Sequence, residues 1–141
     1  MALTERKLVR AEISALFAGL TSVQSNLAYP PLALNGISPL VYLQNDGTLP
    51  TMLAYSSNLF DYFFVLTICV NRQAHGDEGA EDALDDVWTD VMQAIRDNVT
   101  GSTYTALEAA TTRSRPFFAV VDGIPYRFEE VALMVRSNIT G

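Results

Sequence analysis

The residues best suited to chemistry lie in the segment Gln-Ala-His-Gly-Asp-Glu-Gly, residues 73–79. His75 is the single histidine of the chain, and Asp77 and Glu78 follow it closely. A histidine beside two carboxylates could bind a metal ion or transfer protons. The segment offers no second histidine or cysteine as a ligand, and its two glycines favour a mobile loop. The spacing therefore favours a solvated loop histidine over a metal site.

An acidic cluster begins in the same segment and continues along the chain. Its members are Asp77, Glu78, Glu81, Asp82, Asp85 and Asp86. Such a cluster could suggest calcium, but it lacks the Asp-x-Asp-x-Asp-Gly loop with a distal glutamate. Carboxylates at the start of a helix complement its dipole and keep the surface soluble, and some of them could still face a partner.

Nucleophilic catalysis finds little support in the sequence. Cys69 would need an activating base and some exposure, whereas its place in the middle of an apolar segment predicts a small core or interface residue. The chain has no phosphate-binding glycine loop and no nucleophile elbow. We therefore expect neither an enzyme nor a bound cofactor, and a small enzyme remains the rival class of function.

The elements that position these residues are a long strand and a helix in residues 59–99. Even-numbered residues of the strand are apolar, and the helix carries an apolar stripe at spacings of three and four residues. The strand face is Phe60, Tyr62, Phe64, Leu66, Ile68 and Val70; the helix stripe is Ala80, Ala83, Leu84, Val87, Trp88, Val91, Met92 and Ile95. We expect the helix to cover this strand face, with Trp88 in the core. The other face, with Phe63, Val65, Thr67 and Cys69, needs a different cover.

The remaining elements are predicted from periodicity and turn residues. The dipeptide Asp122-Gly123 is the strongest hairpin signal in the chain. Residues 102–114 fit either a short helix or an extended arm. We expect a helix from Thr4 to Leu20 and then, from Ser22 to Ile37, a loop or a short edge strand that contains the turn dipeptide Asn35-Gly36. A strand from Pro39 to Asn45 closed by Asp46-Gly47, a connector through Pro50 to Asn58, and strands from Pro116 to Val121 and from Ile124 to Val135 follow.

Together these elements predict a single α+β domain spanning residues 1–141. We expect a mostly antiparallel sheet of about four strands with two main helices packed on one face. A solvated sheet face normally alternates to polar residues, and the face around Phe63 and Val65 is too apolar for that. The sequence therefore predicts that another subunit covers it.

Composition narrows the possible partners. The chain has 141 residues, is 49% hydrophobic and 18% charged, and has a net charge of −7 with only nine Lys and Arg. Nucleic acid is therefore an improbable primary ligand, and another protein surface is favoured. No segment has the apolar length of a membrane span or the pattern of a signal peptide, so we expect the protein to stay in the cytoplasm in which it is made.

The distribution of charge suggests how copies could meet. Arg6 and Arg10 lie in a basic first helix, which could contact the acidic Asp82, Asp85 and Asp86 of a neighbouring copy. Arg113 and Arg115 could pair with a neighbour's carboxylates or simply keep a loop soluble.

The order of these segments resembles that of the tail terminator proteins of long-tailed, siphovirus-type bacteriophages. The resemblance rests on a first helix ending in LFAGL, a loop with Tyr29-Pro30, the ISPLVY segment from Ile37 to Tyr42, a long apolar strand ending in an acidic loop, a helix with ALDDVWTDVMQAI, and the closing DGIPYRFE from Asp122. It covers nearly the whole chain through order and spacing, with no invariant signature.

The resemblance implies a virion protein of the tail and neck. Six copies would form a ring on the last ring of the tail tube, end its growth, and offer a surface to a head-completion or connector protein. Genome DNA would only pass through, and Asp77, Glu78 and Glu81 are candidates for the ring lumen, where like charge would keep DNA from adhering. Another neck protein, either a head-completion or a head-tail connector protein, is the alternative within the same class.

Overall fold

The long apolar segment forms the central strand of the computed structural model, as its alternating pattern predicts. This strand, β3 (Ser57–Asn71), pairs along its whole length with β2 (Leu40–Ala54) on one edge and β6 (Ile124–Thr140) on the other, antiparallel in both cases. The structure describes residues 6–54, 57–109 and 113–140, with side chains in these ranges except those of 50–54, 57–59 and 138–140.

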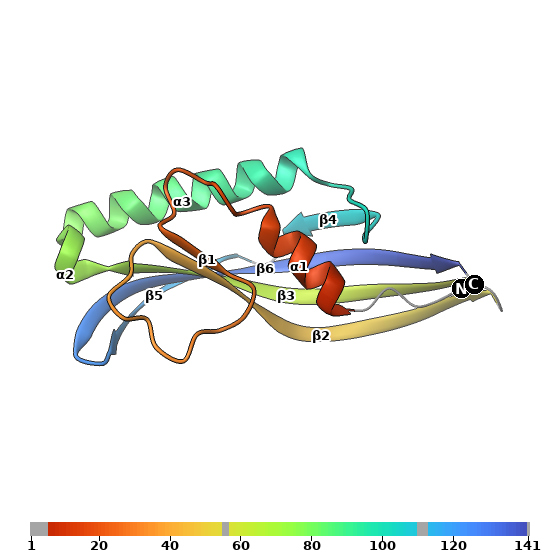
Figure 1. The fold of residues 1–141 in the computed structure, drawn as a ribbon, viewed down its shortest axis with the longest axis horizontal. Coiled ribbons are helices and arrows are strands. Elements are labelled where there is room, and N and C mark those ends of the chain that lie inside the picture. Colours follow the sequence, from red (N-terminus) through yellow and green to blue (C-terminus); the bar gives the residue numbers. More distant parts are fainter. Residues whose placement is uncertain (1–5, 55–56, 110–112, 141) are drawn as a thin grey trace.

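Three shorter strands complete the sheet (Figure 1). β1 (Ser25–Leu27) pairs with β2 in parallel, while β4 (Ala106–Ala109) and β5 (Arg115–Val121) both pair with the edge of β6 that faces away from β3. The α+β class is therefore confirmed. Among the described residues the sheet is mixed and has six strands, so the expectation of about four strands was too small.

The hairpin of β2 and β3 is longer than the sequence predicts. Asp46-Gly47 does not end the strand but lies in a bulge, where the register of β2 on β3 shifts between Asn45 and Thr48. Gly47 has a φ of 114°, which favours glycine. β2 then continues through Pro50 as an edge strand. Proline has no backbone N–H, but an edge strand tolerates this because its outer side has no hydrogen-bonded neighbour. The connector expected from Pro50 to Asn58 was therefore wrong.

The helices are α1 (Arg6–Ala15), α2 (Arg72–His75) and α3 (Asp77–Asp97). α1 ends five residues before Leu20 and continues as turns, and its expected first residue, Thr4, lies outside the described residues. Gly76, with a φ of 76°, separates α2 from α3. The Asn71 side chain caps α2 by accepting hydrogen bonds from the N–H groups of Gln73 and Ala74.

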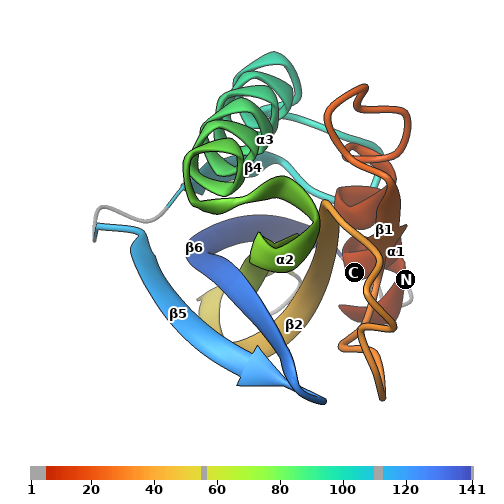
Figure 2. The same ribbon diagram turned by 90° about the vertical axis from the view of Figure 1, so that its left-hand side faces the viewer.

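The main core lies where expected, between the even face of β3 and the helices. α3 packs on β3, β4 and β6, while α1 packs on β2 (Figure 2). Phe64, Leu66 and Ile68 meet Leu84 and Val87 of α3 in one buried cluster. Each such side chain contributes about 1.5–3 kcal/mol through its burial.

The turn signals were read correctly in two places. Asp122 and Gly123, with φ values of 51° and 78°, join β5 to β6 as the hairpin predicts. Asn35 and Gly36 also have positive φ values, as a turn there requires. Residues 102–114 contain β4, so the alternative of a short helix was wrong and the extended one fits.

Candidate assembly interface

The second face of the sheet is covered at one end and open at the other. Cys69 is fully buried, and Thr67 is 3% exposed and forms a side-chain hydrogen bond with Tyr42. Phe63 and Val65, further along β3, are only half-buried. Thr67 therefore does not lie on the surface available to a neighbour, whereas Phe63 and Val65 do.

A second apolar cluster explains the covered end. Its buried members are Leu34 of the loop before β2, Leu40 of β2, Cys69 of β3, and Tyr126 and Phe128 of β6. The sheet curls so that the hairpin of β5 and β6 comes near the loop before β2 (Figure 2). Side chains of both pack in one cluster with Cys69. The chain thus supplies part of the cover that we expected from another subunit.

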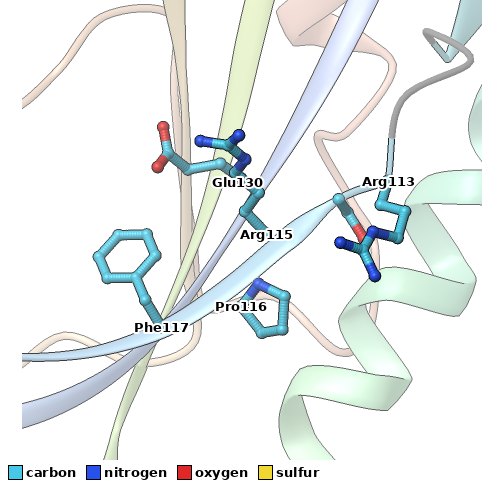
Figure 3. Close-up of a pocket in the computed structure, with 6 residues that line it drawn as sticks. Arg113, Arg115, Pro116, Phe117 and Glu130 are labelled. Atoms are coloured by element: carbon cyan, nitrogen blue, oxygen red, sulfur yellow. The ribbon is translucent and has the colours of Figure 1, made fainter.

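Beyond this cluster lies a cleft that we call the Arg113 cleft. It comprises three adjoining hollows of about 900, 540 and 350 Å³, and Arg113 lines all of them. Figure 3 shows the largest, with Arg113 toward α3 and Arg115, Phe117 and Glu130 at the other end. The other lining residues are Asp46, Val65, Trp88, Met92, Ala109, Ser114, Pro116, Glu129, Val131 and Ala132.

The cleft lies where two strands share one edge of β6. β5 pairs with residues 124–130 of β6 and β4 with residues 133–136, and among the described residues no strand pairs with Val131 and Ala132 on that edge. β4 ends at Ala109 and β5 begins at Arg115. Met92 and Trp88 of α3 line the hollow of about 540 Å³ together with Val131 and Ala132.

Two cations of the cleft have no partner in the described part of the chain. No hydrogen bond or ion pair involves the side chains of Arg113 and Arg115, both of which are exposed. Arg115 lies opposite Glu130 across β5 and β6 without forming an ion pair, and Glu129 accepts a hydrogen bond from Ser114. Both arginines thus remain available to an incoming carboxylate.

The arginines of α1 are less available. Arg6 donates a hydrogen bond to Thr48 Oγ1 at 3.3 Å. Arg10 is half-buried, and its Nε atom is buried without a hydrogen-bond partner among the described residues. The basic character of this helix is therefore partly turned toward its own chain.

Two of the three lumen candidates are also engaged within the chain. Arg72 donates to Asp77 at 2.7 Å, and Arg127 donates to Glu81 at 2.6 Å. Both guanidinium groups also stack on the ring of Phe118, at 4.6 and 4.1 Å from its centre. These contacts tie the start of α3 to β5. Asp77 and Glu81 therefore present less free charge than the sequence suggested, whereas Glu78 is exposed and has no such partner.

The outward face of α3 keeps most of its negative charge. Asp82, Asp85 and Asp86 are exposed, as is Glu78, and none of the four has a hydrogen bond or ion pair to the described residues. Asp90 differs, because it accepts a hydrogen bond from Ser22. The four unpartnered carboxylates, at spacings of three and four residues, follow one face of the helix.

Trp88 is not a core residue, contrary to expectation. It is 39% exposed and lies at the margin of the apolar stripe, on the wall of the Arg113 cleft. The stripe positions that reach the core are Ala80, Leu84, Val87, Val91 and Ile95. Partly exposed tryptophans are frequent anchors of protein interfaces.

Other large apolar side chains are exposed near the turn of β5 and β6. Phe118 and Val120 of β5 are 58% and 70% exposed, and Leu32 in the neighbouring loop is fully exposed. Leu32 and Val121 line one hollow, whereas Phe118 and Val120 lie on the opposite face of β5. On that face the guanidinium groups of Arg72 and Arg127 lie against the ring of Phe118.

His75 and Cys69, the residues with catalytic potential, do not line the Arg113 cleft. His75 Nε2 lies 3.0 Å from Ser38 Oγ, which also accepts the N–H of Asn71. Burial raises the pKa of Cys69 to about 12. Within the ranges that the structure describes, no three His, Cys, Asp or Glu side chains are grouped as metal ligands. None of the described helices is long and apolar enough to cross a bilayer.

Comparison with known proteins leaves the function open. No protein-family model matches this chain, and no curated protein matches it significantly.

Proposed function

We propose that this protein is a structural assembly protein of a long-tailed bacteriophage, namely the tail terminator. It forms a ring, of six copies by the resemblance, that caps the tail tube, ends tube polymerisation and offers a joining surface to a head-completion or connector protein. Its place is the tail and neck of the virion, after assembly in the host cytoplasm. It acts through surfaces and carries out no reaction.

The observation that carries this proposal is the surface that the monomer leaves uncovered. The second face of the sheet is open at Phe63 and Val65, and the adjoining Arg113 cleft exposes Trp88 and two unpartnered arginines. The outward face of α3 presents four carboxylates with no described partner. A chain with several different uncovered surfaces is suited to heterologous contacts, which close into a ring when the rotation between copies closes.

A second support is the set of exposed apolar side chains near the turn of β5 and β6, namely Phe118, Val120 and Leu32. That turn lies at the opposite end of the sheet from the last residues of β6 (Figure 1). A terminator must contact a tube ring on one side and differ from the tube on the other, because tube growth otherwise continues. An apolar end surface distinct from the charged lateral surfaces meets that need.

The direct test is a phage with a nonsense codon early in this gene. Lysates viewed by electron microscopy should contain tails of uncontrolled length that fail to join heads, and a plasmid copy of the gene should restore normal virions. Tails of normal length on filled heads would contradict the proposal. Tails of normal length lying free beside heads would instead indicate another neck protein.

A further inference from the structure

The outer edge of β5 is open in the part of the chain that the structure describes. β5 pairs with β6 on one side, and no other described strand pairs with it. Figure 2 shows β5 at the margin of the sheet, with no described element on its outer side. An open strand edge presents unpaired N–H and C=O groups, and these groups fit one kind of partner, which is another strand.

The geometry of the hairpin shows which backbone groups point outward. A two-residue turn joins β5 to β6, so the first residue pair beside it, Val121 and Ile124, is a hydrogen-bonded one. Hydrogen-bonded pairs then alternate with open pairs along the ladder. Phe118 and Val120 belong to open pairs, so their N–H and C=O groups point away from β6. Pro116 also has an outward position, where an edge strand tolerates its missing N–H.

This edge lacks the features that protect edge strands in other proteins. Charged side chains, prolines, bulges and short length normally discourage pairing with another chain. From Phe117 to Val121, β5 has only apolar residues, and its register on β6 is continuous. The edge strand β2 differs, because it has the bulge at Asp46-Gly47, and β4 is only four residues long. The β5 edge is therefore the one among these three that is suited to accept a further strand.

We propose that β5 of a second copy is this strand, paired antiparallel and edge to edge about a two-fold axis at Ala119. The N–H and C=O groups of Phe118 then bond to those of Val120 in the other copy, and the axis repeats this pair of bonds. The two side chains lie on the same face of β5 and are 58% and 70% exposed. Pairing therefore places an apolar side chain opposite each of them.

The charges at the two ends of β5 favour the same arrangement. Arg115 begins the strand and Asp122 follows it, and both are exposed without a hydrogen bond or ion pair to the described residues. Antiparallel pairing about Ala119 brings Arg115 of each copy beside the turn that contains Asp122 of the other. Parallel pairing would instead bring like charges together. The strand is thus complementary to itself in the antiparallel direction, which identifies a second copy as the partner.

This contact goes beyond the proposed function and does not depend on it. A contact between identical surfaces closes at two copies, so it joins free chains or whole rings in pairs and cannot build the ring itself. It covers an apolar edge that would otherwise be a template for aggregation of the free protein.

Cysteine cross-linking tests the register. Ala119 would lie opposite itself across the axis in an open pair, where the two Cα atoms are about 4.5 Å apart, within the range that a disulfide spans. The Ala119→Cys variant should therefore form a covalent dimer under mild oxidation. Arg115→Cys, at an exposed position of the same strand, should not do so, because it would meet the turn of the other copy and not its own counterpart.

Amide hydrogen exchange provides a second measurement. The N–H groups of Phe118 and Val120 are open in a single copy and bonded in the pair, so their protection should rise with protein concentration. The N–H of Ala119 points toward β6 in either state, so its protection should stay the same. Protection that changes only at alternate residues is the signature of an added strand.

Val120→Lys is the variant that should break the pairing. It places a charge against Phe118 of the other copy, and the axis doubles the effect, so the dissociation constant measured by sedimentation should rise about tenfold or more. Val99→Lys is the matched control, because it makes the same change at a valine that is 52% exposed and lies outside β5. The control should keep the pairing, and both variants should keep the melting temperature of the natural chain within a few degrees.

These measurements decide the inference together. Cross-linked Ala119→Cys dimers, with concentration-dependent protection of Phe118 and Val120 that is lost in Val120→Lys, would support it. Amides of Phe118 and Val120 that stay unprotected at every concentration, an Ala119→Cys variant that does not cross-link, or pairing that persists in Val120→Lys would overturn it. The phage with a nonsense codon tests the proposed function separately, since capping of a tube does not require this contact.

Discussion

The carboxylate of Glu12 is the point at which removal of one side chain should loosen α1 from the rest of the molecule. It accepts four hydrogen bonds from two residues that follow α3. Thr103 donates from its N–H at 2.9 Å and its Oγ1 at 2.8 Å, and Ser102 donates from its N–H at 3.2 Å and from its Oγ. Glu12 therefore links α1 to the segment that follows α3.

The size of the effect follows from these bonds. A hydrogen bond to a charged group contributes about 1.5–3 kcal/mol, but Glu12 is half-buried, and water can replace the carboxylate when it is removed. We therefore expect Glu12→Ala to lower the free energy of unfolding by about 2–3 kcal/mol. Glu12→Gln, which keeps one acceptor oxygen, should cost about half as much.

The same contacts predict a pH dependence. Burial raises the pKa of Glu12, but the hydrogen bonds from Ser102 and Thr103 outweigh this effect, so the pKa lies below its ordinary value of 4.5. Since the folded pKa is lowered, the stabilisation is present above 4.5 and is lost as the pH falls through the folded value. The difference between the natural chain and Glu12→Gln should therefore shrink at acid pH.

Urea unfolding of both variants at neutral and acid pH measures these effects. Glu78→Gln, which changes an exposed glutamate without a described partner, is the control and should stay within about 0.5 kcal/mol of the natural chain. The reasoning would be refuted if Glu12→Ala lowered the free energy of unfolding no more than Glu78→Gln does. It would also be refuted if the difference in stability between Glu12→Gln and the natural chain were the same at every pH.

Three further predictions concern packing and reactivity. Leu84→Ala, in the core stripe of α3, should lower the free energy of unfolding by about 2–5 kcal/mol, and Trp88→Ala should lower it by less. Calorimetry of both variants measures this order. A larger loss for Trp88→Ala than for Leu84→Ala would place Trp88 in the core. Gly101→Ala should lower the free energy of unfolding by about 1–3 kcal/mol, because a Cβ there would lie 2.5 Å from Glu12 Oε1 and 2.5 Å from a ring carbon of Tyr104. Urea unfolding tests this, and a Gly101→Ala variant as stable as the natural chain would contradict it. Cys69, with a pKa raised to about 12, should not react with a thiol reagent at neutral pH until the protein unfolds, and rapid labelling of the folded protein would show that the hairpin of β5 and β6 opens.

Periodicity predicted the local elements because burial imposes it directly. The even positions of β3 and the stripe of α3 face one core, and both follow from side-chain spacing alone. The exposure of Trp88 was not predicted, because this residue lies at the margin of the stripe, where a helical wheel does not distinguish a core position from a flanking one. Asp46-Gly47 was misread because the same dipeptide serves a turn or a bulge, and only pairing with a neighbouring strand decides between them.

The site depends on contacts that local patterns do not contain. The exposure of Arg113 and Arg115 agrees with the surface role considered for them, but their common cleft arises because β4 and β5 share one edge of β6. The cover of Thr67 and Cys69 likewise depends on the curl of the β5 and β6 hairpin. The hydrogen bonds of Glu12 could not be predicted from a local pattern, since its partners lie 90 and 91 residues away along the chain.

The pairing of β3 on both edges has a consequence for the entropy of association. Phe63 and Val65 belong to a strand whose backbone is hydrogen-bonded to β2 on one side and to β6 on the other. The two neighbouring strands fix this backbone before any partner arrives, so a contact at these residues costs mainly side-chain freedom. A partner that packs on Phe63 and Val65 therefore meets a surface that needs little reordering.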